Sequence, residues 1–165
     1  MEKDFPGRPV LNRGFGGSTM RDLLAAFDRV IGVYRPAVLV VYCGENDIAL
    51  GRDPIETAED YRILFERCRR LRPDMRIAVV SMKPSPRRWA PWPQMRRANE
   101  RIAAIGWGFG ADFLDVVPLM LTPAGEPRGE LFREDRLHLN VEGYRLWREV
   151  IGAWLSRPAL PTAAP

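Results

Sequence analysis

Two continuous apolar runs constrain the fold of this chain more than any other feature. Residues 37–42 read AVLVVY, and residues 77–82 read IAVVSM. Runs of this length without polar alternation are typical of strands that are buried on both faces of a parallel sheet. Parallel strands need long crossover connections, which are usually helices. The two runs therefore predict an α/β protein.

Apolar residues spaced three and four positions apart predict four helices around these strands. Thr19 and Asp22 have the spacing of a capping box at the start of the first helix, and Thr57 and Asp60 have it for the second. The four stripes comprise Met20, Leu23, Leu24 and Phe27; Tyr61, Leu64, Phe65, Cys68 and Leu71; Met95, Ala98, Ile102 and Ile105; and Val141, Tyr144, Trp147 and Ile151.

The alternation of strands and helices predicts a three-layer, flavodoxin-like, doubly wound parallel sheet with helices on both faces. Residues 112–117, DFLDVV, supply a further strand, and residues 9–13, PVLNR, supply a short one at the front. Because small doubly wound domains more often have five strands, we expect that the first strand is missing. A single domain is predicted over residues 1–156, followed by a flexible tail over residues 157–165.

Charge and hydropathy limit the partners of the chain. It carries 25 Lys and Arg against 21 Asp and Glu, a formal net charge of +4. Because the basic residues are scattered and interleaved with acids, we expect no nucleic-acid partner. No apolar run approaches the roughly 18 to 20 residues that span a bilayer, and no signal peptide is visible. The sequence thus predicts a cytoplasmic protein without a membrane span, and it leaves a homo-oligomer open.

Three glycines gather in the stretch NRGFGGST, directly before the first predicted helix. A dinucleotide phosphate loop requires glycines at positions one, three and six, but Thr19 takes the sixth position here. Ser18 as a nucleophile is a second interpretation, although a hydroxyl at a helix start is better explained as a cap or a turn donor. The third interpretation is an oxyanion site formed by backbone N–H groups.

Two other short stretches contain residues suited to acyl transfer. The sequence GEND follows the strand at residues 37–42, at the carboxyl end where open α/β sheets place their sites. The amide of Asn46 suits a developing negative charge, whereas the plain alternative is a turn in which Asn46 and Asp47 bond their own backbone. Further on, Asp135 can bind one ring nitrogen of His138, the chain's one histidine, and leave the other nitrogen as a general base. An ordinary surface turn is the alternative for this pair.

Taken together and in this order, the stretches NRGFGGST, GEND and DRLHLNVEGYRLW resemble three sequence blocks of the SGNH hydrolases, the GDSL-type esterase and lipase superfamily. The similarity runs from about Phe5 to Leu155. It implies the SGNH hydrolase fold and the hydrolysis of carboxylic esters, including acetylated sugars and lipids, by a Ser-His-Asp mechanism. It also implies a small-molecule ester as the partner, with no metal and no cofactor.

The same resemblance implies roles for four residues. Gly17 would offer its backbone N–H to the oxyanion, and Asn46 would offer its side-chain amide to the same oxygen. His138 would be the general base and then the general acid, and Asp135 would orient it.

The serine block of the family has no counterpart here, because it should lie upstream of the glycine stretch and no serine precedes Ser18. We therefore expect an N-terminally truncated domain with negligible esterase activity. Cys43 and Cys68 are expected to be core thiols, so Cys43 is not expected to replace the serine. Two further hypotheses stay open: a non-catalytic ester- or carbohydrate-binding domain of the same fold, and a nucleotide-binding domain that uses the glycine turn.

Overall fold

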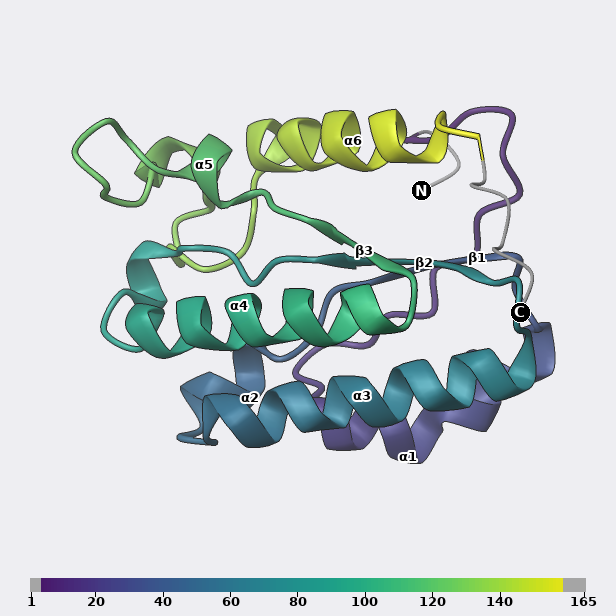
Figure 1. The fold of residues 1–165 in the computed structure, drawn as a ribbon. Helices are drawn as coiled ribbons and strands as arrows, with labels where there is room; N and C mark the ends of the chain where they lie inside the picture. Colours follow the sequence, from purple (N-terminus) through teal and green to yellow (C-terminus); the bar gives the residue numbers. More distant parts are fainter. Residues whose placement is uncertain (1–3, 159–165) are drawn as a thin grey trace.

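A three-stranded parallel sheet lies between two layers of helices in the computed structural model, which describes residues 4–158 (Figure 1). The strands are β1 (Val38–Val41), β2 (Arg76–Val80) and β3 (Ala111–Leu114), and they lie side by side in chain order. Both neighbouring pairs are parallel. The α/β architecture predicted from the apolar runs is confirmed.

The helices divide between the two faces of the sheet. Helices α1 (Met20–Val30), α3 (Pro54–Leu71) and α4 (Trp92–Gly108) cover one face, and α6 (Val141–Leu155) covers the other (Figure 1). Two short helices, α2 (Glu45–Ala49) and α5 (Val117–Met120), follow β1 and β3 where these strands end. The carboxyl ends of all three strands therefore point to the same side of the molecule.

The central strand β2 supplies side chains to a core on each face. Ile77 and Val79 pack with residues of α1, α3 and α4, whereas Ala78 and Val80 pack with residues of α6. All four are at most 2% exposed. Successive side chains of a strand point to opposite faces, so a strand between two helical layers needs apolar residues at every position. This explains the unbroken apolar run in the sequence.

Strand β1 was predicted to be buried on both faces of the sheet, but it lies at an edge. Its one strand partner in residues 4–158 is β2, and Val38 is 37% exposed. Residues 9–13, predicted as a short strand, belong to no strand. The described part of the sheet thus has three strands where the sequence predicted four.

The predicted capping box at the start of α1 is confirmed, whereas the one predicted for the start of α3 is wrong. Thr19 caps α1 in a reciprocal capping box with Asp22. Helix α3 begins one turn before the predicted Thr57–Asp60 box, at Pro54, and its cap is Asp53, whose side chain accepts the N–H of Ile55 at 2.7 Å. Proline is favoured in the first turn because its missing N–H needs no partner there.

The last helix ends at Leu155. The predicted flexible tail over residues 157–165 lies outside the described residues, apart from its first two. None of the helices in residues 4–158 is both long and apolar enough to cross a bilayer.

Candidate functional site

The turn between β1 and α2 brings Asn46 to the carboxyl edge of the sheet. Gly44, the N-cap of α2, has φ +96°, a left-handed conformation that favours glycine. A Cβ atom at this position would lie 2.6 Å from the terminal methyl carbon of Met82 in the loop after β2. The glycine therefore allows a sharp turn and leaves room for the end of the Met82 side chain.

The amide of Asn46 joins this turn to the glycine turn, residues 12–19. Its Nδ2 donates to the carbonyl oxygen of Ser18 at 2.9 Å. The neighbouring Gly17 is exposed with φ +74°, and in the described residues its N–H has no acceptor. The two predicted oxyanion donors are thus on adjoining turns, and the second hydrogen of the amide has no acceptor within residues 4–158.

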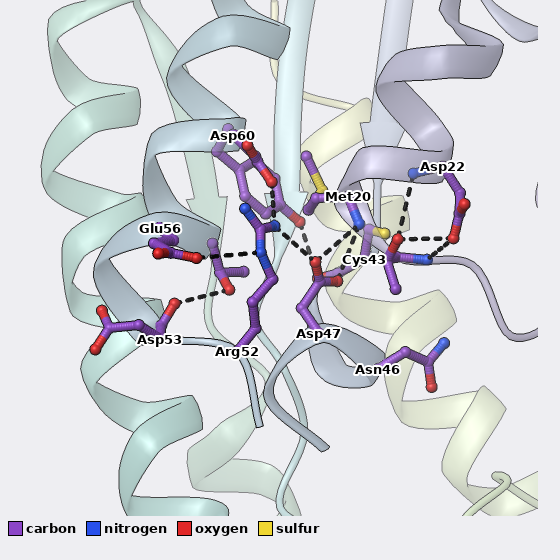
Figure 2. Close-up of polar contacts among 12 residues, drawn as sticks. Met20, Asp22, Cys43, Asn46, Asp47, Arg52, Asp53, Glu56 and Asp60 are labelled. Atoms are coloured by element: carbon purple, nitrogen blue, oxygen red, sulfur yellow. Dashed lines mark hydrogen bonds and ion pairs between the residues drawn. The ribbon is translucent and has the colours of Figure 1, made fainter. Parts of the chain in front are cut away.

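Asp47 holds the same two segments together from the buried side. Its carboxylate oxygens lie 2.9 and 3.2 Å from the backbone N of Met20, at the start of α1. Arg52 donates to Asp47 at 3.1 Å and also binds Asp60 of α3. Figure 2 shows that the side chains of Asn46 and Asp47 leave α2 in different directions. The alternative in which these two residues only bond their own backbone is wrong.

Asp135 and His138 pair within the loop at residues 132–140, called here the histidine loop. Nδ1 of His138 lies 2.6 Å from Oδ2 of Asp135, while Oδ1 of Asp135 accepts the N–H groups of Leu137 and His138. These hydrogen bonds hold the pKa of Asp135 well below its usual range. Nε2 of His138 has no partner in the described residues, and the side chain is 66% exposed.

The loop between β2 and α4, residues 81–91, contacts both parts of the site. The N–H of Arg87 donates to the carbonyl of Arg136 in the histidine loop at 3.0 Å. The guanidinium of Arg88 donates to Oδ1 of Asn46 at 2.8 Å. The histidine loop and the amide of Asn46 are therefore bonded to consecutive residues of one loop. The sequence did not predict this link.

Next to Arg88 lie the buried side chains of Glu45 and Lys83, together with the hydroxyl of the partly exposed Tyr42. Glu45 accepts from the ammonium of Lys83 at 2.6 Å and from the hydroxyl of Tyr42. Burial lowers the pKa of Lys83, partly offset by the carboxylates of Glu45 and Asp135. Burial of its hydroxyl and the charge of Glu45 raise the pKa of Tyr42 well above its usual value.

Three of the four serines of the chain have hydrogen-bonded hydroxyls, and the fourth, Ser85, has a buried hydroxyl without a partner in the described residues. The hydroxyl of Ser18 donates to Phe15 O at 3.0 Å, so it is a turn donor rather than the helix cap, which is Thr19. Ser81 accepts the N–H of Val116 and is buried. Ser85 is fully buried, and Ser156 bonds within the end of α6.

The thiols are also protected. Burial raises the pKa of Cys43 to about 12, with the charge of Asp47 adding to the effect, and burial raises the pKa of Cys68 to about 11. Both side chains are buried. Their placement in the core is the one predicted.

A cavity of about 500 Å³ borders the Asp47 network. Its lining includes Thr19, Arg21, Asp47, Arg52 and Glu56. Within residues 4–158, no group of three or more His, Cys, Asp or Glu side chains is arranged to hold a metal ion. The cavity shares Asp47 with the site but contains neither His138 nor Asn46.

Comparison with known proteins identifies the family. A model of the GDSL-like lipase/acylhydrolase family matches residues 1–146. The chain belongs to this family. The residues matched include the glycine turn, the GEND sequence and the histidine loop, so all the stretches brought together at this edge lie in the GDSL-like region.

Several solved structures, including one of a GDSL-like lipase, share the fold. A Streptococcus pneumonia protein matches with a TM-score of 0.82 at 20% identity, over 93% of this chain and 76% of that one. A GDSL-like lipase from Bacteroides thetaiotaomicron matches with a TM-score of 0.79 at 20% identity, over 93% and 78%. An acetyl xylan esterase matches with a TM-score of 0.73 at 18% identity, over 86% and 78%. A search of curated protein sequences gave no match.

Proposed function

We propose that this edge of the sheet is a site for hydrolysis of carboxylic esters by acyl transfer. The observation that carries the proposal is the short contact between Asp135 and Nδ1 of His138, 2.6 Å, because it leaves Nε2 as a free proton acceptor. In this proposal His138 is the general base and then the general acid, and Asp135 orients its ring. The N–H of Gly17 and Nδ2 of Asn46 stabilise the negative charge that develops on the carbonyl oxygen.

The substrate class in this proposal is a small ester. Membership of the GDSL-like lipase/acylhydrolase family supports it, and one structural neighbour is an acetyl xylan esterase. Acetyl esters of sugars therefore belong in the first substrate panel, beside short-chain p-nitrophenyl esters.

We further propose that residues 1–165 by themselves turn over esters negligibly. The contacts of Ser18, Ser81 and Ser156 occupy their hydroxyls, and Ser85 is fully buried. Loss of the nucleophile from a serine triad costs about a millionfold in turnover. A non-catalytic domain that binds esters or carbohydrates is the second candidate, favoured by the hydrogen bonds of three serines and the burial of the fourth.

Hydrolysis of p-nitrophenyl acetate tests these proposals. Residues 1–165 should show no turnover above the buffer rate, and calorimetry with an acetylated xylo-oligosaccharide should detect binding without product if the second candidate holds. Robust turnover that disappears in His138→Ala would contradict the proposed inactivity and require a nucleophile within the chain.

A second arm tests the catalytic roles directly. The reading frame upstream of Met1 is expressed together with residues 1–165, and its turnover is measured. If acyl transfer is correct, His138→Ala abolishes the activity that this longer chain gains. Asn46→Ala should lower kcat by roughly a hundredfold to a thousandfold, as expected for an oxyanion donor. An active longer chain that is indifferent to both substitutions would refute the assignment of the site.

A further inference from the structure

Arg88 makes two contacts with neighbouring residues of α2. Its Nη1 lies 3.1 Å from Oε1 of Glu45, and its Nη2 donates to Oδ1 of Asn46 at 2.8 Å. The first contact is an ion pair and the second is a hydrogen bond. The guanidinium is planar and always charged, so one rigid group connects Glu45 and Asn46. The side chain of Arg88 is only 20% exposed, so most of it is packed against the protein.

The orientation of the Asn46 amide follows from its two partners. A guanidinium can only donate, so the amide oxygen must face Arg88. A backbone carbonyl can only accept, so Nδ2 must face Ser18 O, 2.9 Å away. Rotation of the amide by half a turn would set donor against donor and acceptor against acceptor. The contact with Arg88 therefore keeps Nδ2 directed toward the glycine turn.

Glu45 provides a rigid anchor for Arg88. Its side chain is only 5% exposed, and its other oxygen accepts from Lys83, which is 7% exposed, and from Tyr42. The ring of Tyr42 packs edge-on against Trp147 of α6, with centroids 4.7 Å apart. The anchor is thus held by both the loop after β2 and the opposite helical layer.

The preceding residue, Arg87, differs from Arg88 in how it contributes. Its backbone N–H holds the histidine loop through Arg136 O, whereas its side chain is exposed. The two residues have the same chemistry and adjoining positions, but only one of the two side chains contacts Asn46. They therefore form a matched pair for a test.

We infer that Arg88 is a positioning residue for the proposed reaction: anchored on Glu45, it keeps Nδ2 of Asn46 directed toward the glycine turn, beside which the proposed oxyanion binds. The effect of Arg88 on catalysis rests on the proposed function, but the orientation of the Asn46 amide can be measured without turnover. Arg88 touches no reacting atom and acts through Asn46.

The side-chain amide signals of Asn46 in a ¹H–¹⁵N spectrum of residues 1–165 provide the measurement, and Asn46→Ala assigns them. Arg88→Lys keeps the charge but cannot reach Glu45 and Asn46 with a planar pair of donors. We expect this variant to shift both amide proton signals. It should also raise their exchange with water by about tenfold, because an amide no longer held at Oδ1 by a charged donor breaks its bond from Nδ2 to Ser18 O more often. Arg87→Lys should leave both signals unchanged.

The inference is overturned if Arg88→Lys and Arg87→Lys give the same Asn46 signals. The backbone signals in the same spectra report whether each variant is folded. Should Arg88→Lys not fold, Glu45→Gln gives the second test, because loss of the anchoring charge should release Arg88 and shift the same two signals. Unchanged Asn46 signals in a folded Glu45→Gln variant would also overturn the inference.

Kinetics of an active longer chain separate this inference from the proposed function. There, Arg88→Lys should lower kcat about tenfold with KM unchanged, because a displaced amide weakens binding of the transition state but not of the ester. If the longer chain is inactive, or its activity ignores His138→Ala, the proposed function fails while the amide signals still decide the role of Arg88. A raised KM with unchanged kcat would count against positioning.

Discussion

Asp47 and Met20, 27 positions apart in the sequence, are joined by a buried contact in which both carboxylate oxygens face one backbone N–H, at 2.9 and 3.2 Å. The N–H belongs to the first residue of α1, which has no partner within the helix. Asp47 therefore caps α1 from a distance while Thr19 caps it locally. Since Asn46 precedes Asp47, the same short helix contacts both ends of the Ser18–Met20 segment.

Asp47→Asn should destabilise the protein. The substitution replaces one buried acceptor by an NH₂ donor that faces either Met20 N–H or Arg52, and it removes a charge that is fully buried beside Arg52. Breaking a buried ion pair in this way costs on the order of 2–4 kcal/mol. Urea denaturation measures the loss, with Asp28→Asn on the exposed face of α1 as control, which should change the free energy of unfolding by less than about 0.5 kcal/mol. Equal effects of the two substitutions would contradict the role given to Asp47.

Gly44→Ala should be more damaging than Gly51→Ala, although both glycines have a similar positive φ, +96° and +88°. An alanine at either position has the strain of a left-handed backbone, about 1 kcal/mol or more. At Gly51 a Cβ meets nothing within 4 Å, whereas at Gly44 it meets Met82 at 2.6 Å and Thr57 at 3.3 Å. The free energy of unfolding should therefore fall by roughly 1 kcal/mol more for Gly44→Ala. Indistinguishable denaturation midpoints would show that the Met82 side chain moves aside without a cost in stability.

The sequence predicted the parts of the fold that depend on local patterns. The Thr19–Asp22 box marks the start of α1 because both halves of the interaction lie within one turn. The box at Thr57 and Asp60 was misleading, since a stronger signal, Asp53 followed by Pro54, stands one turn earlier. In α6, Val141 and Tyr144 fit the apolar spacing but are exposed, because the first turn packs against Leu131 and Leu139 through Gly143 instead.

The contacts that build the site could not be predicted from local patterns. The pairing of Asp135 with His138 was predicted from a spacing of three residues, and the structure has this contact. The links from Asn46 to Ser18 and from Arg88 to Asn46 span 28 and 42 positions, and no periodicity encodes them. The edge position of β1 depends on which strands pair with it, and the apolar run AVLVVY is the same for an edge strand and a central one.

Asp135 should stabilise the fold in a pH-dependent way. Three hydrogen bonds, the largest effect coming from His138, hold the pKa of Asp135 below the ordinary value of about 3.9 that it regains on unfolding. A lowered pKa in the folded state means that the stabilisation is complete above the unfolded pKa and is lost as the pH falls below it. The difference in free energy of unfolding between wild type and Asp135→Asn should therefore be larger at about pH 5 than at about pH 2.5.

Urea denaturation at these two pH values measures the difference, and an unchanged m value shows that the same unfolding transition is being compared. The two pH values span the range in which carboxyl groups titrate. If the difference in free energy of unfolding between wild type and Asp135→Asn grows as the pH falls, the pKa of Asp135 is not lowered in the folded protein. Asp135 would then lose its charge beside His138 at low pH.

The thiol of Cys43 should be inert in the folded protein. Its pKa is raised to about 12, chiefly by burial, and Sγ lies 3.8 Å from Ser18 O, to which a protonated thiol donates weakly. Only the thiolate attacks disulfide reagents, so at about pH 8 Cys43 should react with Ellman's reagent on the order of a thousandfold more slowly than a free cysteine. Cys68→Ala isolates the signal of Cys43, and guanidinium chloride should restore the full rate by unfolding the chain. Fast labelling of the folded Cys68→Ala variant would show an accessible thiolate beside Asn46, and Cys43 would then have to be considered as the nucleophile that the serines do not provide.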